Sequence, residues 1–194
     1  SPRYTGPVEI GKSARFRATA LREGGENASY SREFAFSKST GRPAVLNTKP
    51  NDSYTFEGAS LLVDGYHSRP VFTSGAWLGY LDEPLDVTID MGGEQSYRSV
   101  ELETLAEKGD WIFPPSSVTV WVSDNGTDFT EVASVAVPEA KAGDADGIGR
   151  YRMQFPETSA RYLKVVAQNA AAIPAWHPGA GSKGFLFVDE VVVE

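Results

Sequence analysis

The chain has 194 residues, with 26 Asp or Glu and 18 Lys or Arg side chains, so its formal net charge is −8. This acidic balance argues against a nucleic acid or an anionic membrane surface as the partner, because both attract clustered basic side chains. The absence of Cys excludes disulfides and thiolate metal sites, and no apolar run approaches the roughly 18 residues of a membrane-spanning helix.

The N-terminal part is basic, unlike the rest of the chain. Residues 1–50 carry nine basic and four acidic side chains, whereas residues 51–194 carry nine and 22. Small or apolar side chains at positions 14, 16, 18 and 20 alternate with Arg15, Arg17 and Thr19, which predicts a strand with one face in water. The basic surplus fits either a solvated strand face or a contact with another domain.

Turn-forming residues without periodicity occupy positions 39–43 and 49–53. We therefore predict a small N-terminal β unit over residues 1–40, a linker over 41–54 and a main domain over 55–194. The length of the main part suits one sandwich domain.

The main domain alternates with a period of two rather than 3.6. Apolar and polar side chains alternate over residues 85–90 and 118–123, and Asn125-Gly126 then predicts a tight hairpin turn. Further short strands are predicted over 129–137, 151–155, 161–166 and 185–193. No window of a dozen residues holds a helical stripe, so the sequence predicts an all-β sandwich.

The last of these strands has one carboxylate on each of its two apolar faces, Asp189 and Glu190. Successive residues of a strand point to opposite faces, so we expect these two carboxylates not to converge. A buried carboxylate is costly unless it is paired with a cation or bound to a metal.

Five short segments occur in the order found in discoidin-like domains, that is, the coagulation-factor 5/8 type C fold. They are residues 62–65 (Leu-Val-Asp-Gly), 77–79 (Trp-Leu-Gly), 87–92 (Val-Thr-Ile-Asp-Met-Gly), 123–126 (Ser-Asp-Asn-Gly) with Phe129, and 160–165 (Ala-Arg-Tyr-Leu-Lys-Val). Residues 55–194 thus resemble this family. The resemblance implies a jelly-roll β-sandwich, and many members of the family bind galactose or hexosamines.

Other segments resemble a narrower group. Residues 110–115 (Asp-Trp-Ile-Phe-Pro-Pro), 176–181 (Trp-His-Pro-Gly-Ala-Gly) and 186–190 are similar to the version appended to bacterial β-N-acetylhexosaminidases of glycoside hydrolase family 20. Residues 4–20 look like the second half of the small chitobiase/hexosaminidase C-terminal domain. The resemblance implies a C-terminal fragment of a periplasmic or extracellular glycoside hydrolase, with the catalytic domain of the same polypeptide as a partner.

Family 20 enzymes use an adjacent Asp-Glu pair, and this chain has two such pairs, Asp82-Glu83 and Asp189-Glu190. We expect neither to be catalytic, because the second pair lies on a strand and the barrel that would carry the real pair is absent. The fragment is therefore predicted not to be an enzyme.

The resemblance also implies a structural Ca²⁺. In discoidin-like sugar-binding modules a Glu at the position of Glu190 commonly ligates Ca²⁺ together with oxygens of the loop that here contains Asp64, and Ca²⁺ takes such hard oxygen ligands. The alternative is a carboxylate at the sandwich rim that is paired with Arg or capped by backbone N–H groups. Tyr66 and Arg69 in this loop depart from the usual pattern.

Loop aromatics are the candidate ligand-binding residues, because sugar rings stack their C–H faces on such side chains. Trp111 and Phe113 precede two prolines, and Trp176 and His177 lie in the last long loop. We predict a carbohydrate-binding module for glycans with N-acetylhexosamine or galactose. The alternative is a structural domain that docks on and stabilises the catalytic barrel. Trp77 is expected in the core, and Trp121 is expected to pack under a loop or a neighbouring domain.

Overall fold

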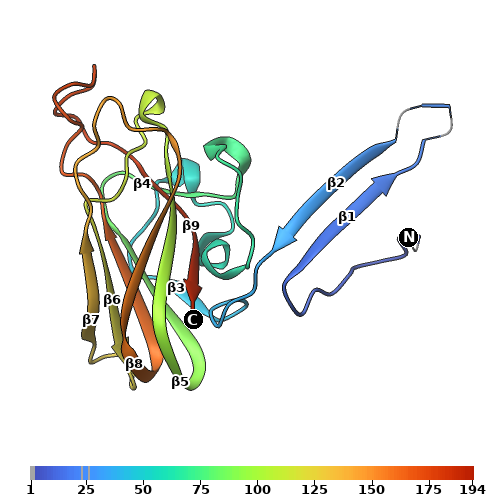
Figure 1. Cartoon of the computed structure of the whole chain (residues 1–194), viewed down its shortest axis with the longest axis horizontal. Helices are drawn as coiled ribbons and strands as arrows, with labels where there is room; N and C mark the ends of the chain where they lie inside the picture. Colours follow the sequence, from blue (N-terminus) through green and yellow to red (C-terminus); the bar gives the residue numbers. More distant parts are fainter. Residues whose placement is uncertain (1–2, 23, 26) are drawn as a thin grey trace.

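The computed structural model describes residues 3–22, 24–25 and 27–194. Within these ranges the regular structure consists of strands and short 3₁₀ helices (Figure 1). No helix of the described residues is long and apolar enough to cross a membrane. The elements in chain order are β1 (Ala14–Ala20), β2 (Ala28–Phe34), β3 (Ala44–Leu46), η1 (Asp52–Tyr54), η2 (Gly58–Val63), η3 (Phe72–Ser74), β4 (Leu78–Tyr80), β5 (Leu85–Ala106), η4 (Lys108–Asp110), β6 (Ser117–Ser123), β7 (Thr130–Ala136), β8 (Gly147–Gln168) and β9 (Leu186–Val193).

Two long antiparallel strands, β5 and β8, build the sandwich by bending back on themselves. Their register is interrupted between Asp90 and Gln95, where Gly92 adopts a positive φ of 80° that favours glycine. The first half of β5 pairs with β3, and the second half pairs with β9, which also pairs with β4. The second half of β8 pairs with β6, which continues to β7. The bends lie at the lower end of the sandwich in Figure 1.

The core lies between the two layers and is built from the alternating positions that the sequence predicted. Leu85, Val87 and Ile89 are fully buried, as are Val118 and Val120. Burying one such side chain stabilises the fold by about 1.5–3 kcal/mol. The all-β jelly-roll prediction is therefore confirmed, and the alternation is its physical reason.

Trp77 lies in a second buried cluster with Leu105, Ile112 and Phe187, and its indole N–H donates to the carbonyl of Arg69 at 3.0 Å. It is thus a core residue, as expected. Trp121 lies half-buried on the outer face of β6, where the Nζ of Lys164 stands 5.7 Å from its ring centroid.

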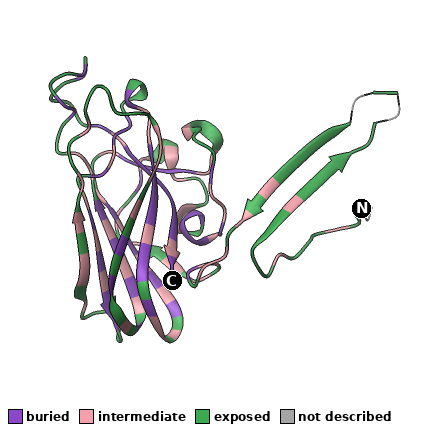
Figure 2. Ribbon diagram, in the orientation of Figure 1, coloured by how far each residue is buried: buried purple, intermediate pink, exposed green. Residues whose placement is uncertain are grey.

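The N-terminal hairpin of β1 and β2 projects from the sandwich and is exposed over nearly its whole length (Figures 1 and 2). Register places Phe16 opposite Arg32 and Ala18 opposite Tyr30 on one face, whereas Arg15 forms an ion pair with Glu33 on the other. The ribbon is amphipathic: at its base Phe34 and Arg32 pack on Tyr66 of the sandwich, whereas Tyr30 farther along the same face is exposed. The predicted unit over residues 1–40 also contains residues 1–2, 23 and 26, which lie outside the described residues.

The predicted linker over residues 41–54 differs from the structure, because part of it belongs to the sandwich. Ala44 pairs with Ile89 and Leu46 with Val87 in the sheet, and the preceding Ser39 is fully buried and donates to the carbonyl of Val191. A three-residue strand is too short to show a period in the sequence. The sandwich therefore begins before residue 44.

Two further details differ from the sequence-based expectation. The strands predicted over 151–155 and 161–166 are halves of the single bent strand β8. The turn after β6 is longer than a two-residue hairpin: Gly126 has a positive φ, whereas the side chain of Asn125 accepts from the N–H groups of Thr127 and Asp128. An Asx turn therefore replaces the backbone turn that Asn-Gly predicted.

Candidate functional site

Two loops meet at the end of the sandwich opposite the β5 and β8 bends (Figure 1). The first loop comprises residues 107–116, between β5 and β6, and the second comprises residues 169–185, between β8 and β9. The first loop closes on itself through paired backbone hydrogen bonds between Glu107 and Ile112. Inside it Trp111 adopts a positive φ of 64°, which is uncommon for a non-glycine residue. The second loop is joined to the first because the N–H of Phe185 donates to the carbonyl of Trp111 at 2.8 Å.

His177 stands at the centre of an aromatic cluster formed by these loops. Its ring centroid lies 6.1 Å from that of Trp111, 5.5 Å from that of Phe113 and 5.5 Å from that of Trp176, each in an edge-to-face arrangement. Such geometry is the favourable one for aromatic rings. The sequence predicted these four residues as one site, and the structure brings all four together.

Hydrogen bonds fix the orientation of the His177 ring. Nε2 lies 2.9 Å from the carbonyl oxygen of Lys108, so Nε2 carries the proton and donates it. Nδ1 accepts the backbone N–H of Gly179 at 3.0 Å. Both ring nitrogens are therefore engaged by backbone, and His177 supports its neighbours rather than offering a free polar group.

The four residues divide into two exposed and two buried side chains. Trp111 is 42% exposed and Trp176 is 40% exposed, whereas Phe113 and His177 are 2% and 8% exposed. The Trp111 ring lies against Gly179, where a Cβ atom would stand only 2.8 Å from Cζ2. The indole N–H of Trp176 donates to the carbonyl of Ala140 at 2.9 Å. Of the four, the two indoles are the exposed side chains, and their role in binding a ligand stays a prediction.

Lys108 lies in η4, in the first loop of this end of the molecule, and its role was not predicted from the sequence. Its buried Nζ pairs with the carboxylate of Asp146 and donates to the carbonyl of Asp144 at 2.8 Å. Although partial burial opposes the shift, the hydrogen bonds from Lys108 hold the pKa of Asp146 below its ordinary value. No sequence signal marks a buried lysine, because its partner is 38 residues away.

An apolar groove of about 400 Å³ adjoins the aromatic cluster. Three segments form it, residues 113–116, 137–140 and 170–175. Its lining is mainly proline and alanine, with Phe113 on the side of the cluster. No sequence pattern predicts this groove, because its walls come from three separate connections.

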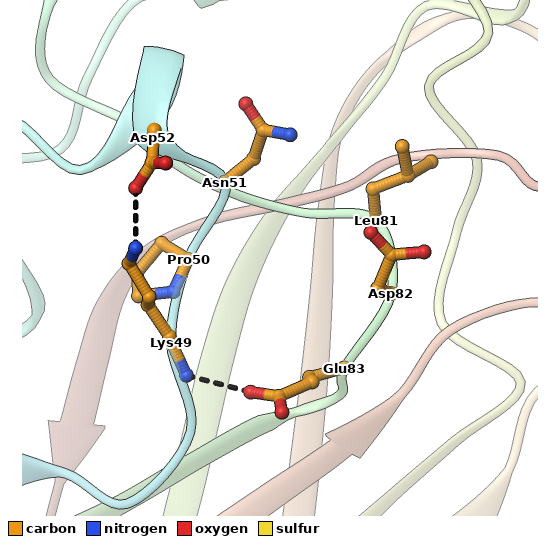
Figure 3. Close-up of a pocket in the computed structure, with 7 residues that line it drawn as sticks. All are labelled: Lys49, Pro50, Asn51, Asp52, Leu81, Asp82 and Glu83. Carbon is orange, nitrogen blue, oxygen red and sulfur yellow. Dashed lines mark hydrogen bonds and ion pairs between the residues drawn. The ribbon is translucent and has the colours of Figure 1, made fainter.

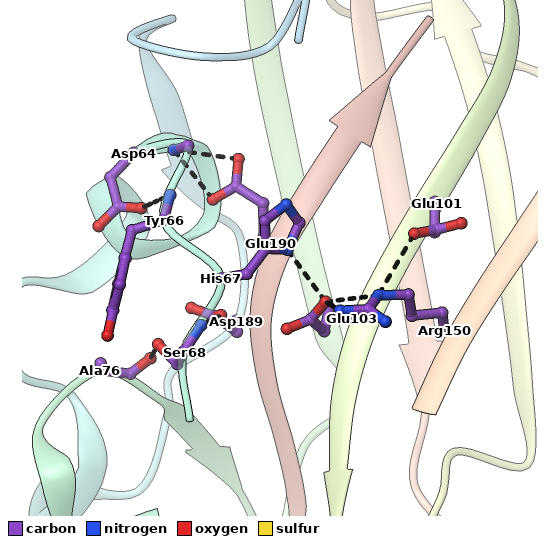
Figure 4. A network of polar contacts seen from close by, with 11 residues as sticks. Asp64, Tyr66, His67, Ser68, Ala76, Glu101, Glu103, Arg150, Asp189 and Glu190 are labelled. Atoms are coloured by element: carbon purple, nitrogen blue, oxygen red, sulfur yellow. Dashed lines mark hydrogen bonds and ion pairs between the residues drawn. The ribbon is translucent and has the colours of Figure 1, made fainter. Parts of the chain in front are cut away.

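A second group of candidate residues lies beneath the loop after η2 (Figure 4). Glu190 is fully buried, and both of its carboxylate oxygens accept the N–H of Gly65, at 3.3 and 3.2 Å. Burial raises the pKa of Glu190 to about 10, and the carboxylates of Asp64 and Asp189 add to the shift. Asp64 itself accepts the N–H of Tyr66 at 2.7 Å, and burial raises its pKa as well.

The expectation that Asp189 and Glu190 point to opposite sides of the sheet is wrong. Asp189 accepts the N–H of Ser68 at 2.7 Å, so both carboxylates bind the same loop. The cause is a β-bulge: Leu102 pairs with Val191 and Thr104 with Val188, which leaves one extra residue on β9. The bulge cancels the alternation on which the prediction depended. Burial raises the pKa of Asp189 to about 8.

Glu103 completes this group from the facing strand and was not predicted. It is buried, and its Oε2 contacts Nδ1 of His67 at 3.0 Å and the guanidinium of Arg150 at 2.8 Å. The hydrogen bond that His67 donates to Glu103 raises the pKa of His67. The other oxygen, Oε1, is buried without a hydrogen-bond partner.

The donor chemistry of this group fits a hard cation such as Ca²⁺. Asp189 and Glu190 are buried and Asp64 is half-buried, and no ion pair to a basic side chain is found for these three carboxylates among the residues described. However, the described side chains hold no ready-made set of three or more metal ligands. Backbone carbonyl oxygens and water would have to complete the coordination shell.

The Asp82-Glu83 pair lies at a polar groove of about 260 Å³ (Figure 3). Asp82 pairs with the Nζ of Lys183 at 2.6 Å, and Glu83 accepts the backbone N–H of Lys49 at 2.8 Å. Figure 3 shows the two carboxylates pointing in different directions. Each is engaged by a different part of the chain, so the geometry gives them no joint role.

Comparison with known proteins identifies the family and the fold. The family model described as F5/8 type C domain matches residues 47–183. No curated protein sequence is similar enough to count as a relative.

Solved structures with a similar fold include CpGH89CBM32-5 from Clostridium perfringens in complex with GalNAc-β-1,3-galactose, at 17% identity and a TM-score of 0.52, covering 78% of this chain and 93% of that one. Chitosan-binding module 1 of a chitosanase/glucanase from Paenibacillus sp. IK-5 is 18% identical, with a TM-score of 0.52 and coverages of 81% and 98%. A fucose binding module of Streptococcus pneumoniae is 22% identical, with a TM-score of 0.50 and coverages of 81% and 94%.

Proposed function

The chain belongs to the F5/8 type C domain family, and on that premise we propose that it is a non-catalytic module that binds glycans through Trp111 and Trp176. One observation carries the proposal: two indoles at one end of the sandwich stay exposed although buried neighbours hold both in place. An exposed apolar patch built from more than one large side chain marks a binding site more often than a single exposed residue does. The named ligands of similar folds, GalNAc-β-1,3-galactose and fucose among them, point the same way.

The physical basis is stacking on a preformed surface. Pyranose rings present C–H faces that pack on indole, and rings already held by His177 lose little freedom when the ligand arrives. Two shallow contacts bury little area, so the expected dissociation constant for a short glycan lies in the range of about millimolar to micromolar.

Calorimetric titration of the chain with N-acetylglucosamine, N-acetylgalactosamine and galactose tests this proposal. Trp111→Ala and Trp176→Ala should each abolish the binding heat. Trp121→Ala is the matched control, because Trp121 lies on the outer face of β6 away from the loops. Unchanged binding in both loop variants, or no binding by the intact chain at tens of millimolar, would contradict the proposal.

The wider context is also part of the proposal. We propose that the module is appended to a β-N-acetylhexosaminidase of glycoside hydrolase family 20 that works in the periplasm or outside the cell. The support is the similarity of residues 110–115 and 176–181 to that group. The module would hold the catalytic domain near glycans that carry N-acetylhexosamine or galactose.

A second candidate function is docking on the catalytic domain. The N-terminal hairpin favours it, because a two-stranded ribbon is marginally stable alone and this one leaves Tyr30 exposed and Phe16 only half-buried. Phe16→Ser should then weaken association with the catalytic domain in a pull-down and leave sugar binding unchanged. Equal association of the variant and the unaltered chain would remove this candidate.

We also propose a structural Ca²⁺ held by Asp64 and Glu190. The support is the grouping of carboxyl groups beneath the loop, whose raised pKa values show that their charged forms lack a cation partner there. When bound, Ca²⁺ would supply only charge neutralisation and cross-linking of the loop to β9. The residues of the chain fix the loop through the N–H groups of Gly65 and Ser68.

A further inference from the structure

The apolar groove beside Trp176 is a built feature of the fold. The N–H of Ser116 donates to the carbonyl of Gln168 at 2.8 Å, and the N–H of Val137 donates to the carbonyl of Ser116 at 2.9 Å. These bonds tie together the three segments that form the walls. Pro114, Pro115 and Pro138 fix the backbone of two walls, so the groove is preformed before any ligand binds.

The groove is continuous with the aromatic cluster. Phe113 belongs to both, since it lines the groove and lies 6.4 Å from the Trp176 ring centroid. The indole N–H of Trp176 reaches across to the carbonyl of Ala140, which lines the opposite wall. A sugar ring stacked on Trp176 therefore has the groove alongside it.

The lining of the groove decides what can enter it. Twelve of its 14 lining residues are apolar, and the two polar ones are Ser116 and Glu139. The hydroxyl of Ser116 is already committed to the carbonyl of Asn169 at 2.9 Å. Sugar hydroxyls would lose water in this groove and find few partners, which is unfavourable. An apolar substituent meets no such penalty.

We propose, on the basis of the glycan-binding function above, that this groove selects pyranoses that bear a methyl group. The shared chemistry is a methyl substituent on the sugar, which arises either in an acetamido group or at C6 of a 6-deoxy sugar. The volume of about 400 Å³ lies at the low end of the roughly 300–1,000 Å³ of ligand pockets, so the groove takes the methyl-bearing group while the ring itself stacks on Trp176.

Titrations with matched pairs of sugars test the selectivity. The pairs are N-acetylglucosamine against glucose and L-fucose against L-galactose, which differ in the methyl-bearing group. Each methyl-bearing sugar should bind about four- to tenfold more tightly than its partner, as expected for burying one such group. Preference in only one pair identifies the acetamido or the deoxy source. Equal affinity within both pairs overturns the inference.

A variant that fills the groove gives the second test. Ala172 lines the groove and is exposed, so Ala172→Leu should reduce the preference to within about twofold and leave glucose and L-galactose binding unchanged. Ala28→Leu on the hairpin is the matched control and should keep the full preference. An equal loss of affinity for all four sugars would show that the groove does not recognise the methyl group. This result would overturn the inference.

Two further readouts keep the outcomes distinct. In the unaltered chain, the acetamido methyl protons should show intermolecular NOEs to Ile173 and the alanines of residues 170–172, whatever the stability of the variant. If glucosamine bound more tightly than N-acetylglucosamine, and Glu139→Gln abolished this difference, the Glu139 carboxylate would bind an ammonium group. That result would overturn the inference. Absence of binding by every sugar contradicts the glycan-binding function itself, whereas binding without methyl preference contradicts only this inference.

Discussion

The two side-chain clusters of this molecule differ in whether the chain itself satisfies them. At the loop end, His177 has both ring nitrogens hydrogen-bonded to backbone and three aromatic rings around it. Beneath the loop after η2, Glu190 has only the N–H of Gly65 and lies among other carboxylates. The first cluster is complete and neutral, whereas the second carries buried negative charge that needs a cation or protons.

The two clusters should therefore respond to different changes. A complete neutral cluster is sensitive to the shape of its side chains, because each ring positions the next. An incomplete charged cluster is sensitive to metal and to pH. Metal removal and pH changes therefore act on the carboxyl cluster, whereas substitution of a ring acts on the aromatic cluster.

Removal of Ca²⁺ should have the largest effect. A ligand that binds only the folded state at about a thousandfold excess over its Kd stabilises by about 4 kcal/mol. For a chain of this size, exhaustive chelation should then lower the Tm by roughly 8–16 °C, and added Ca²⁺ should restore it while Mg²⁺ does so poorly. Differential scanning calorimetry measures the shift.

Glu190→Gln is the matched variant for this experiment. It keeps the shape of the side chain and removes the charge, so it should abolish the response of the Tm to Ca²⁺. An unchanged Tm after chelation of the intact chain, with no metal found by elemental analysis, would instead support protonated carboxyl groups capped by backbone N–H.

The pH dependence of the chelated protein should be the next largest effect. In the folded state the pKa of Asp189 is about 8 and that of Glu190 about 10, whereas unfolded carboxyl groups titrate near about 4. Between these values the folded state binds more protons, so the free energy of unfolding falls as the pH rises. Thermal melts of the chelated protein should show the Tm falling steadily from pH 5 to pH 8. Saturating Ca²⁺ should make the Tm nearly independent of pH over this range. A Tm of the chelated protein that rises with pH would contradict the difference described between the two clusters.

Substitution of His177 should have a smaller effect on stability and a clear one on binding. His177→Phe keeps an aromatic ring but leaves the carbonyl of Lys108 and the N–H of Gly179 without partners, which costs about 2 kcal/mol. The Tm should fall by several degrees and glycan affinity by about tenfold, because the indoles lose their support. His67→Phe is the control in the charged cluster and should leave the affinity unchanged. Wild-type affinity in His177→Phe would show that the indoles need no such support.

The strands could be predicted where alternation is long. Residues 85–90 and 118–123 show it plainly, and the structure has strands there with the expected faces buried. The three-residue strands β3 and β4 show no period, so sequence reasoning missed them. The bend that joins the halves of β8 lies where the register with β5 shifts between Gln154 and Thr158, and Pro156 in this stretch has no N–H to donate to the sheet.

The candidate sites were predictable only in part. Aromatic residues in Pro- and Gly-rich loops marked Trp111 and Trp176, and an acidic pair in an apolar strand marked Glu190. The β-bulge that turns Asp189 to the same side depends on the count of residues in two paired strands, which one strand does not reveal. Glu103 and Lys108 gave no signal, because their burial depends on partners far away in the chain.

The central claim is that the loop end binds glycans, and chemical-shift mapping on the ¹⁵N-labelled chain tests it most directly. Titration with N-acetylglucosamine and N-acetylgalactosamine should shift the amide signals of residues 107–113 and 173–179 together with the indole N–H signals of Trp111 and Trp176. The amides of the hairpin strands β1 and β2 should stay unchanged. Shifts confined to the hairpin, or no shifts at tens of millimolar sugar, would contradict the claim.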